Sequence, residues 1–78
     1  MKRPMKPRDR IGARELDELT SRQHEVYELL LGGLQNKEIA QRLSLRVRTI
    51  RFHVANVLRK LHVDSRIALI VAARDGAW

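Results

Sequence analysis

Residues 47–61 read VRTIRFHVANVLRKL, and this stretch decides the fold of the chain. Its apolar side chains recur at steps of three and four residues, which is the spacing of one buried stripe on a helix. The stripe consists of Val47, Ile50, Val54, Val57, Leu58 and Leu61. The other side of the same helix carries Arg48, Arg51, Phe52, Ala55 and Arg59. The pattern therefore predicts a helix with one face in a core and one cationic face.

The cationic face has two interpretations. A basic helix anchored by branched aliphatic residues suits the major groove of DNA, whose width admits one helix. The alternative is a solvated basic face, which is the usual meaning of surface charge. The residues that precede the helix favour the first interpretation.

Two shorter helices are expected upstream of residue 47. The first covers about residues 21–31, with Thr20 as N-cap, Gln23 as its capping-box partner and a glycine pair at 32–33 to end it. Its inward stripe is expected to be Val26, Leu29, Leu30 and Gly33. The second covers about residues 36–43 and is followed by the turn 44–46. A short helix, a tight turn and a longer basic helix form the helix-turn-helix pattern, so the fold class is all-α.

The charge of the chain is segregated along the sequence. The whole chain has a formal net charge of +7. Residues 1–14 carry six basic side chains and one acidic, residues 15–34 carry one basic and five acidic, and residues 35–60 carry seven basic and one acidic. This layout indicates a defined cationic surface with a polyanionic partner, most commonly nucleic acid. Residues 1–14 are expected to form a flexible basic arm that adds phosphate contacts, with a plain tail as the alternative.

Several function classes are disfavoured by what the sequence lacks. There is no glycine-rich phosphate loop, no metal-ligand cluster and no nucleophile beside a base, so neither an enzyme nor a cofactor is expected. Without cysteine there is no disulfide framework, which suits a reducing cytoplasm. No apolar run approaches the roughly 20 residues that span a bilayer, and no signal peptide is expected.

Four ordered motifs resemble the LuxR/GerE-type helix-turn-helix domain. They are LTxRxxEV at 19–26, GxxNKEIAxxL at 33–43, TIRxHV at 49–54 and KLxVxSR at 60–66. The resemblance covers about residues 19–76, so residues 15–78 are assigned to the domain. It implies a four-helix bacterial DNA-binding domain of a transcription regulator, located on the nucleoid when bound. It also implies that the third helix enters the major groove and that the fourth often mediates dimerisation.

The resemblance implies one set of residues for the phosphate backbone. Lys37, Thr49 and Lys60 match backbone-contacting positions, and their hydroxyl and ammonium groups can reach phosphate oxygens. His53 matches a position near the backbone, although a structural role for it stays open. Arg59, at the far end of the cationic face, is assigned to the same set.

A second set is expected to read bases. Arg51, Phe52 and Ala55 lie where the resemblance places base contacts, and Arg48 and Asn56 flank them. Arg51 can make a bidentate contact to guanine, and Phe52 can lie on a thymine methyl group. Asn56 can read an adenine or hold a phosphate.

Three residues depart from the family pattern. Gln35 replaces the usual Ser or Thr cap of the second helix, which leaves Asn36 as an alternative cap. Arg46 replaces a capping Ser before the recognition helix, at a cost of roughly 1 kcal/mol. His62 replaces a usual glycine after that helix, so a strained or altered turn is expected.

The last helix is expected at residues 66–74, capped by Asp64 or Ser65 and ended by Gly76. It is apolar nearly all round, more than a chain of this size can cover. By the resemblance, Leu69, Ile70 and Ala73 face the core. The remaining apolar residues, Ile67, Ala68 and Val71, are expected to form a homodimer surface on a two-fold axis, which implies an inverted-repeat DNA site. The alternative is packing against a partner domain.

Three functions therefore stay open. The favoured one is a sequence-specific DNA-binding regulator, either alone or as the output domain of a longer response regulator. The second is a sigma-factor-like module that contacts RNA polymerase. The third is an interaction module whose basic face binds an acidic protein.

Overall fold

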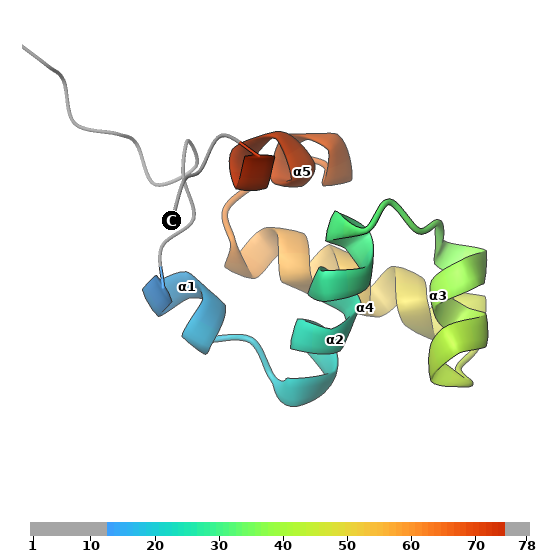
Figure 1. The fold of residues 1–78 in the computed structure, drawn as a ribbon. Coiled ribbons are helices and arrows are strands. Elements are labelled where there is room, and N and C mark those ends of the chain that lie inside the picture. Colours follow the sequence, from blue (N-terminus) through green and yellow to red (C-terminus); the bar gives the residue numbers. More distant parts are fainter. Residues whose placement is uncertain (1–12, 75–78) are drawn as a thin grey trace, which may run out of the picture.

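Residues 13–74 of the computed structural model are described here, and within this range the chain forms five helices and no strand. The helices are α1 (Ala13–Asp17), α2 (Ser21–Leu31), α3 (Asn36–Leu43), α4 (Val47–Lys60) and α5 (Arg66–Arg74). The expected all-α helix-turn-helix fold is confirmed, and α2, α3 and α5 coincide with the predicted ranges. Helix α4 lies behind α2 and α3 in the view of Figure 1, with α5 above it and α1 at the lower left.

Helix α1 was not expected from the sequence. It begins at Ala13, inside the range assigned to the basic arm, and has only five residues. Leu16 packs against the core, which is the tertiary contact that holds so short a helix in place. The rest of the expected arm lies outside the described residues, as does Gly76.

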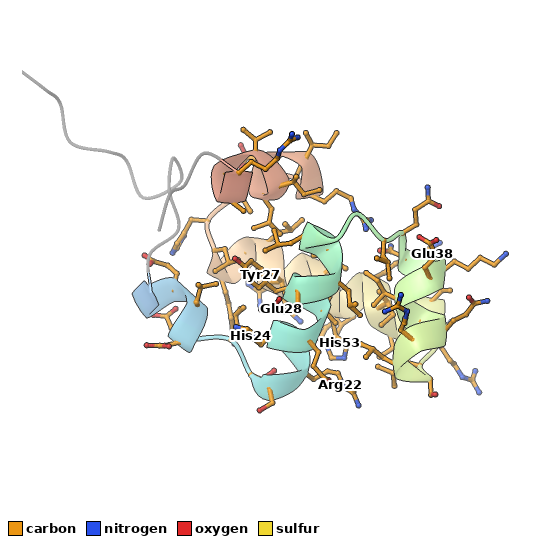
Figure 2. The ribbon with its side chains drawn as sticks, in the orientation of Figure 1. Arg22, His24, Tyr27, Glu28, Glu38 and His53 are labelled. Carbon is orange, nitrogen blue, oxygen red and sulfur yellow. The ribbon has the colours of Figure 1, made fainter. Side chains whose placement is uncertain are left out.

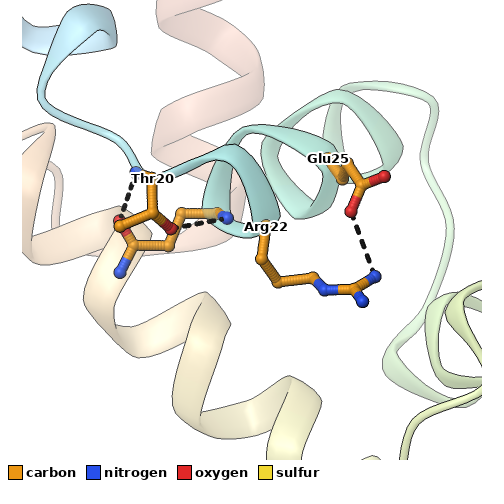
Figure 3. A network of polar contacts seen from close by, with 4 residues as sticks. Thr20, Arg22 and Glu25 are labelled. Carbon is orange, nitrogen blue, oxygen red and sulfur yellow. Dashed lines mark hydrogen bonds and ion pairs between the residues drawn. The ribbon is translucent and has the colours of Figure 1, made fainter.

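Helix α2 begins with the predicted capping box, drawn in Figure 3. The backbone N–H of Gln23 donates to Thr20 Oγ1 over 3.1 Å, and the N–H of Thr20 donates to Gln23 Oε1 over 3.0 Å. One turn further, Arg22 pairs with Glu25 at 3.0 Å on the exposed side. Gly33 follows the helix with a φ of 85°, the left-handed conformation that was expected to end it.

The turn between α3 and α4 joins two closely packed helices. Ser44 adopts a left-handed φ of 57°, and the N–H of Leu45 donates to the carbonyl of Ala40 over 2.9 Å. Ala40 is buried and small, which allows α3 and α4 to cross closely. At the other end of α3 the N-cap is Gln35, whose N–H donates to Glu38 Oε1 over 2.7 Å. Asn36 therefore does not take over the cap, because it is already the first helical residue. Figure 2 labels Glu38 near this end of α3.

The core is built around α4, which packs against both α2 and α3, while α2 also packs against α5. Its fully buried members include Val26, Leu30, Ile39, Ile50, Val57, Leu61 and Leu69. Leu29 and Leu58 of the predicted inward stripes are partly buried against this core. Two other stripe residues are exposed: Val47 is 36% exposed in the first turn of α4, and Gly33 is exposed after the end of α2. Both lie where a helix starts or stops, so periodicity within the helix does not determine their burial.

Tyr27 is a core residue that the sequence did not reveal. It is buried on α2, on the side where His24 packs against its ring with 5.6 Å between ring centroids (Figure 2). Burial, with a smaller contribution from the nearby Glu28 carboxylate, raises the pKa of Tyr27 to about 12. The folded state therefore favours the protonated phenol, and this contribution to stability is lost as the pH rises from about 10 to about 12.

Helix α5 packs through Leu69 and Ala72, which are buried. Of the three residues expected to face the core, only Leu69 belongs to it; Ile70 and Ala73 are half-buried. Of the two expected caps, Ser65 performs the role, because its Oγ accepts from the N–H of Ala68 over 3.1 Å. The Arg66 guanidinium ties the start of α5 to α3 by donating to Asn36 Oδ1 over 3.0 Å and to the Leu34 carbonyl over 2.9 Å. The α2–α3 loop and α5 are thus held together by one side chain.

Candidate nucleic-acid interface

One side of α4 is exposed and cationic, as the sequence predicted. Its side chains are Arg48, Arg51, Phe52, Ala55 and Arg59, all of them exposed. They lie there because Ile50, Val54 and Val57 of the same helix are buried against α2 and α3. Phe52, a large hydrophobic residue, is 65% exposed in the middle of this face. The set is called the cationic face of α4 below.

The charges at the start of this face are not neutralised by neighbours. Within residues 13–74, Arg48 and Arg51 make no ion pair or side-chain hydrogen bond, whereas Arg22 on α2 is paired with Glu25. Arg46, directly before the helix, is exposed and makes no side-chain capping bond, as expected. An unpaired guanidinium keeps all five of its N–H donors available for an anion or a base edge.

Lys37 adds a further exposed cation at the first turn of α3. The N-terminal turn of a helix presents unpaired N–H groups and a positive dipole end, which favour a phosphate group. A hollow beside it is lined in part by Asn36, Lys37 and Arg66. Thr49, in the first turn of α4, is half-buried.

Asn56 does not lie on the exposed face where the sequence placed it. It is only 9% exposed, and its Oδ1 accepts a hydrogen bond from Arg59 Nη2 over 2.6 Å. The amide is therefore inside the molecule with its oxygen already bonded. Helical spacing predicted that Asn56 lies at the edge of the cationic face. In the structure this edge of α4 is buried by packing.

Lys60, which was expected to contact phosphate, makes hydrogen bonds within the fold. Its ammonium group donates to the Glu18 carbonyl and to Gln23 Oε1, both over 2.9 Å. Gln23 is itself buried, so Lys60 joins the end of α4 to the segment that leads into α2. An ammonium group has three donors, and two of them are used within the fold.

His53 is half-buried between the two faces of α4. Its Nδ1 atom is buried and has no hydrogen-bond partner among the described residues, and its ring lies 6.0 Å from that of Phe52. The His53 ring therefore lies beside the Phe52 ring, tilted by 57° to it.

The described range has neither a candidate metal site nor a candidate membrane-spanning helix. Residues 13–74 hold no group of three or more side chains arranged to bind a metal ion. No helix in that range has the length and apolar character needed to cross a membrane.

Comparison with known proteins agrees with this geometry. The model of the GerE family, described as bacterial regulatory proteins of the luxR family, matches residues 17–73. The chain belongs to this family. The matched range contains α2, the helix-turn-helix of α3 and α4, and most of α5, so the resemblance identified from the sequence motifs is confirmed. The chain thus carries the DNA-binding domain of a transcription regulator. Domains of this family are typically not enzymatic.

Curated relatives include several response regulators. The transcriptional regulatory protein DesR of Bacillus subtilis is 41% identical over 64 residues, which cover 82% of this chain and 32% of DesR. The nitrate/nitrite response regulator protein NarP of Escherichia coli is 39% identical over 69 residues, covering 86% of this chain and 32% of NarP. A nitrate/nitrite response regulator homologue of Haemophilus influenzae is 45% identical over 56 residues, covering 72% of this chain and 27% of the relative. The chain therefore spans about a third of the length of these relatives.

Proposed function

We propose that the chain binds double-stranded DNA sequence-specifically by inserting the cationic face of α4 into the major groove. The observation that carries this proposal is that Arg48, Arg51 and Phe52 are exposed together and that the two arginines are unpaired within the described residues. Phe52, which is 65% exposed, lies between the arginines. This combination suits the major groove, because guanidinium groups read guanine and an aromatic ring can contact the thymine methyl group.

The residues divide into base-reading and backbone-contacting groups. We assign base reading to Arg48, Arg51, Phe52 and Ala55. Lys37 and Thr49 lie in the first turns of α3 and α4, the two helices of the helix-turn-helix, where phosphate oxygens can meet unpaired N–H groups. We assign both to the phosphate backbone.

The experiment that tests DNA reading starts by selecting the preferred DNA sequence from a random duplex pool. Replacing Arg51 by Ala is then expected to cost roughly 1–3 kcal/mol on the selected site and to relax the preference at one base pair. Replacing Lys37 by Ala should weaken binding to all sequences alike and flatten the salt slope by about one unit. Arg74→Ala removes the same charge from the end of α5 and is the matched control. If Arg51→Ala lowers affinity without changing preference, Arg51 is a phosphate contact and the proposed orientation of α4 is wrong.

We further propose that α5 pairs two copies of the chain. Ile67 is 70% exposed and Val71 is 48% exposed, and their spacing of four residues places them on one stripe of the helix. Ala68, which was expected beside them, is instead partly buried against the core, because it lies on the side of α5 that packs inward. The dimer surface proposed here therefore consists of Ile67 and Val71. One helix per partner gives a small interface, so a weak free dimer, roughly micromolar, is expected.

A two-fold axis through α5 would present two α4 helices to one inverted-repeat site. Val71→Glu should leave the monomer folded, since the side chain points outward, yet abolish cooperative occupancy of two half-sites. Ser21→Glu introduces the same charge at an exposed position on α2 and serves as the control. Sedimentation of the free protein and titration with one and two half-sites measure the effect. Unchanged cooperativity in the Val71→Glu protein would show that this surface is idle.

A further inference from the structure

Asn56 and Arg59 form a bonded pair in the second half of α4. The Nη2 group of Arg59 donates to Asn56 Oδ1 over 2.6 Å, and the two residues are three apart, so they lie on adjacent turns. Asn56 is 9% exposed, while Arg59 is exposed. The buried, neutral amide of Asn56 thus accepts a hydrogen bond from the exposed, charged guanidinium of Arg59.

Arg59 lies on the same side of α4 as the base-reading residues. Arg48, Phe52, Ala55 and Arg59 follow one another at steps of four, three and four residues, which keeps them on one stripe of the helix. With a rise of about 1.5 Å per residue, Arg59 is about 10 Å further along the axis than Phe52. The major groove is about 12 Å wide. A helix that places Phe52 in the groove therefore brings Arg59 to the phosphate backbone that borders it.

Asn56 is unsuited to reading a base itself. Recognition of adenine by an asparagine uses both the amide oxygen and the amide nitrogen at the base edge. In this structure the oxygen is bonded to Arg59, and the residue is enclosed by the packing of α4. Bringing the amide to a base would require breaking that bond and exposing a buried part of the helix.

The neutral character of the partner matters for what Arg59 can do. An arginine side chain has many rotamers, and part of this rotamer entropy is lost whenever the side chain is fixed by a ligand. The bond to Asn56 restricts the guanidinium before any ligand arrives and uses only one of its five N–H donors. Because the acceptor is an amide, the positive charge is not cancelled. Arg22, in contrast, is fixed by the Glu25 carboxylate, which neutralises it.

We propose that Asn56 is a positioning residue that orients Arg59 toward a DNA phosphate at the end of the recognition helix. This inference rests on the DNA binding proposed above and assigns Asn56 a role other than base reading. It identifies Arg59 as a pre-oriented phosphate contact, and it explains why an amide rather than a carboxylate stands at residue 56.

The sharpest test is Asn56→Asp, which keeps the shape and the bond but replaces the neutral acceptor with a charged one. Cancelling the charge of Arg59 should weaken binding to every duplex about ten-fold and flatten the salt slope by about one unit, as Arg59→Ala should do. Base preference should not change. Ser21→Glu again controls for net charge. A folded Asn56→Asp protein with the parental salt slope would overturn the proposal, and so would a loss of preference at a single A·T pair, because that outcome makes Asn56 a reader.

A double-mutant cycle keeps the proposal testable if Asn56→Asp fails to fold. Asn56→Ala, Arg59→Ala and the double variant are compared at a temperature where circular dichroism shows all three folded. If Asn56 acts through Arg59, Asn56→Ala weakens binding a few-fold in the parent and has no effect once Arg59 is gone. Additive losses would overturn the positioning role.

The salt slope of the parent protein separates this inference from the proposed function. If the parent shows no salt-dependent binding to duplex DNA, the proposed function itself is wrong. If the parent binds with a normal salt slope but the cycle is additive, only the role of Asn56 is wrong.

Discussion

The two halves of α4 differ in how their polar side chains are used. In the first half, Arg48 and Arg51 make no bond to another described residue, and Phe52 is largely exposed. In the second half, Asn56, Arg59 and Lys60 are all bonded within the molecule. Cationic side chains of one helix can therefore serve different purposes. The unbonded side chains are available to a ligand. Of the bonded ones, Lys60 joins α4 to the segment that leads into α2, whereas the bond to Asn56 fixes Arg59 and leaves its charge available for a phosphate.

The largest expected effect comes from the bonded half. Lys60→Met removes two hydrogen bonds from an ammonium group and leaves the Gln23 amide without its charged donor. We expect the free energy of unfolding to fall by about 2 kcal/mol, measured by urea denaturation at constant m-value. Arg51→Met, which removes an unbonded cation from the first half, should leave stability nearly unchanged. A Lys60→Met protein with parental stability and a flatter salt slope would show that Lys60 is a phosphate contact after all.

The next effect concerns the free half and its exposed ring. Phe52→Ala should leave stability unchanged but weaken binding to the selected DNA site by roughly 1.5 kcal/mol, because the ring buries apolar surface only in the complex. Replacing each thymine of the site in turn by deoxyuridine, which lacks only the methyl group, locates the contact. One such replacement should cost the parent protein about 0.8 kcal/mol and cost the Phe52→Ala protein nothing. An equal cost in both proteins would place the methyl contact on another side chain.

A smaller effect is expected where α4 begins. Arg46 occupies the N-cap without a side-chain capping bond, and its charge faces the positive end of the helix dipole. Arg46→Ser should therefore raise the free energy of unfolding by about 1 kcal/mol. Thermal unfolding followed by circular dichroism measures this change, with Arg46→Ala as the control that removes the charge without adding a cap. If both variants are equally stable, the cap contributes nothing.

The smallest effect is expected just after α4 ends. His62 has a φ of 59°, a conformation that costs little only for glycine. His62→Gly should relieve this strain and stabilise the protein by roughly 0.5 kcal/mol, net of the greater flexibility of glycine in the unfolded chain. Denaturant titration of the two proteins gives the difference. A destabilised His62→Gly protein would mean that the imidazole makes a compensating contact.

Local rules predicted the helices well because they act over a few residues. The Thr20–Gln23 capping box, the left-handed glycine at 33 and the turn at 44–46 were all expected from the sequence and are present. The departures at Arg46 and His62 also have the expected local consequences. The short α1 was missed, since five residues have little helical tendency of their own and depend on Leu16 packing against the core.

Residue periodicity alone determined that α4 would have a buried aliphatic face and an exposed cationic one, and the ordered motifs alone identified the family. Periodicity could not decide what happens at the boundary between the faces, because a helix specifies angular positions and not what lies opposite them. Only the tertiary structure showed that Asn56 and Tyr27 are buried and that Ala68 packs against the core. It also showed that Lys60 Nζ lies 2.9 Å from Gln23 Oε1, 37 residues away in the chain. The geometry of these contacts depends on how α2 and α3 pack against α4 and how α5 packs against α2.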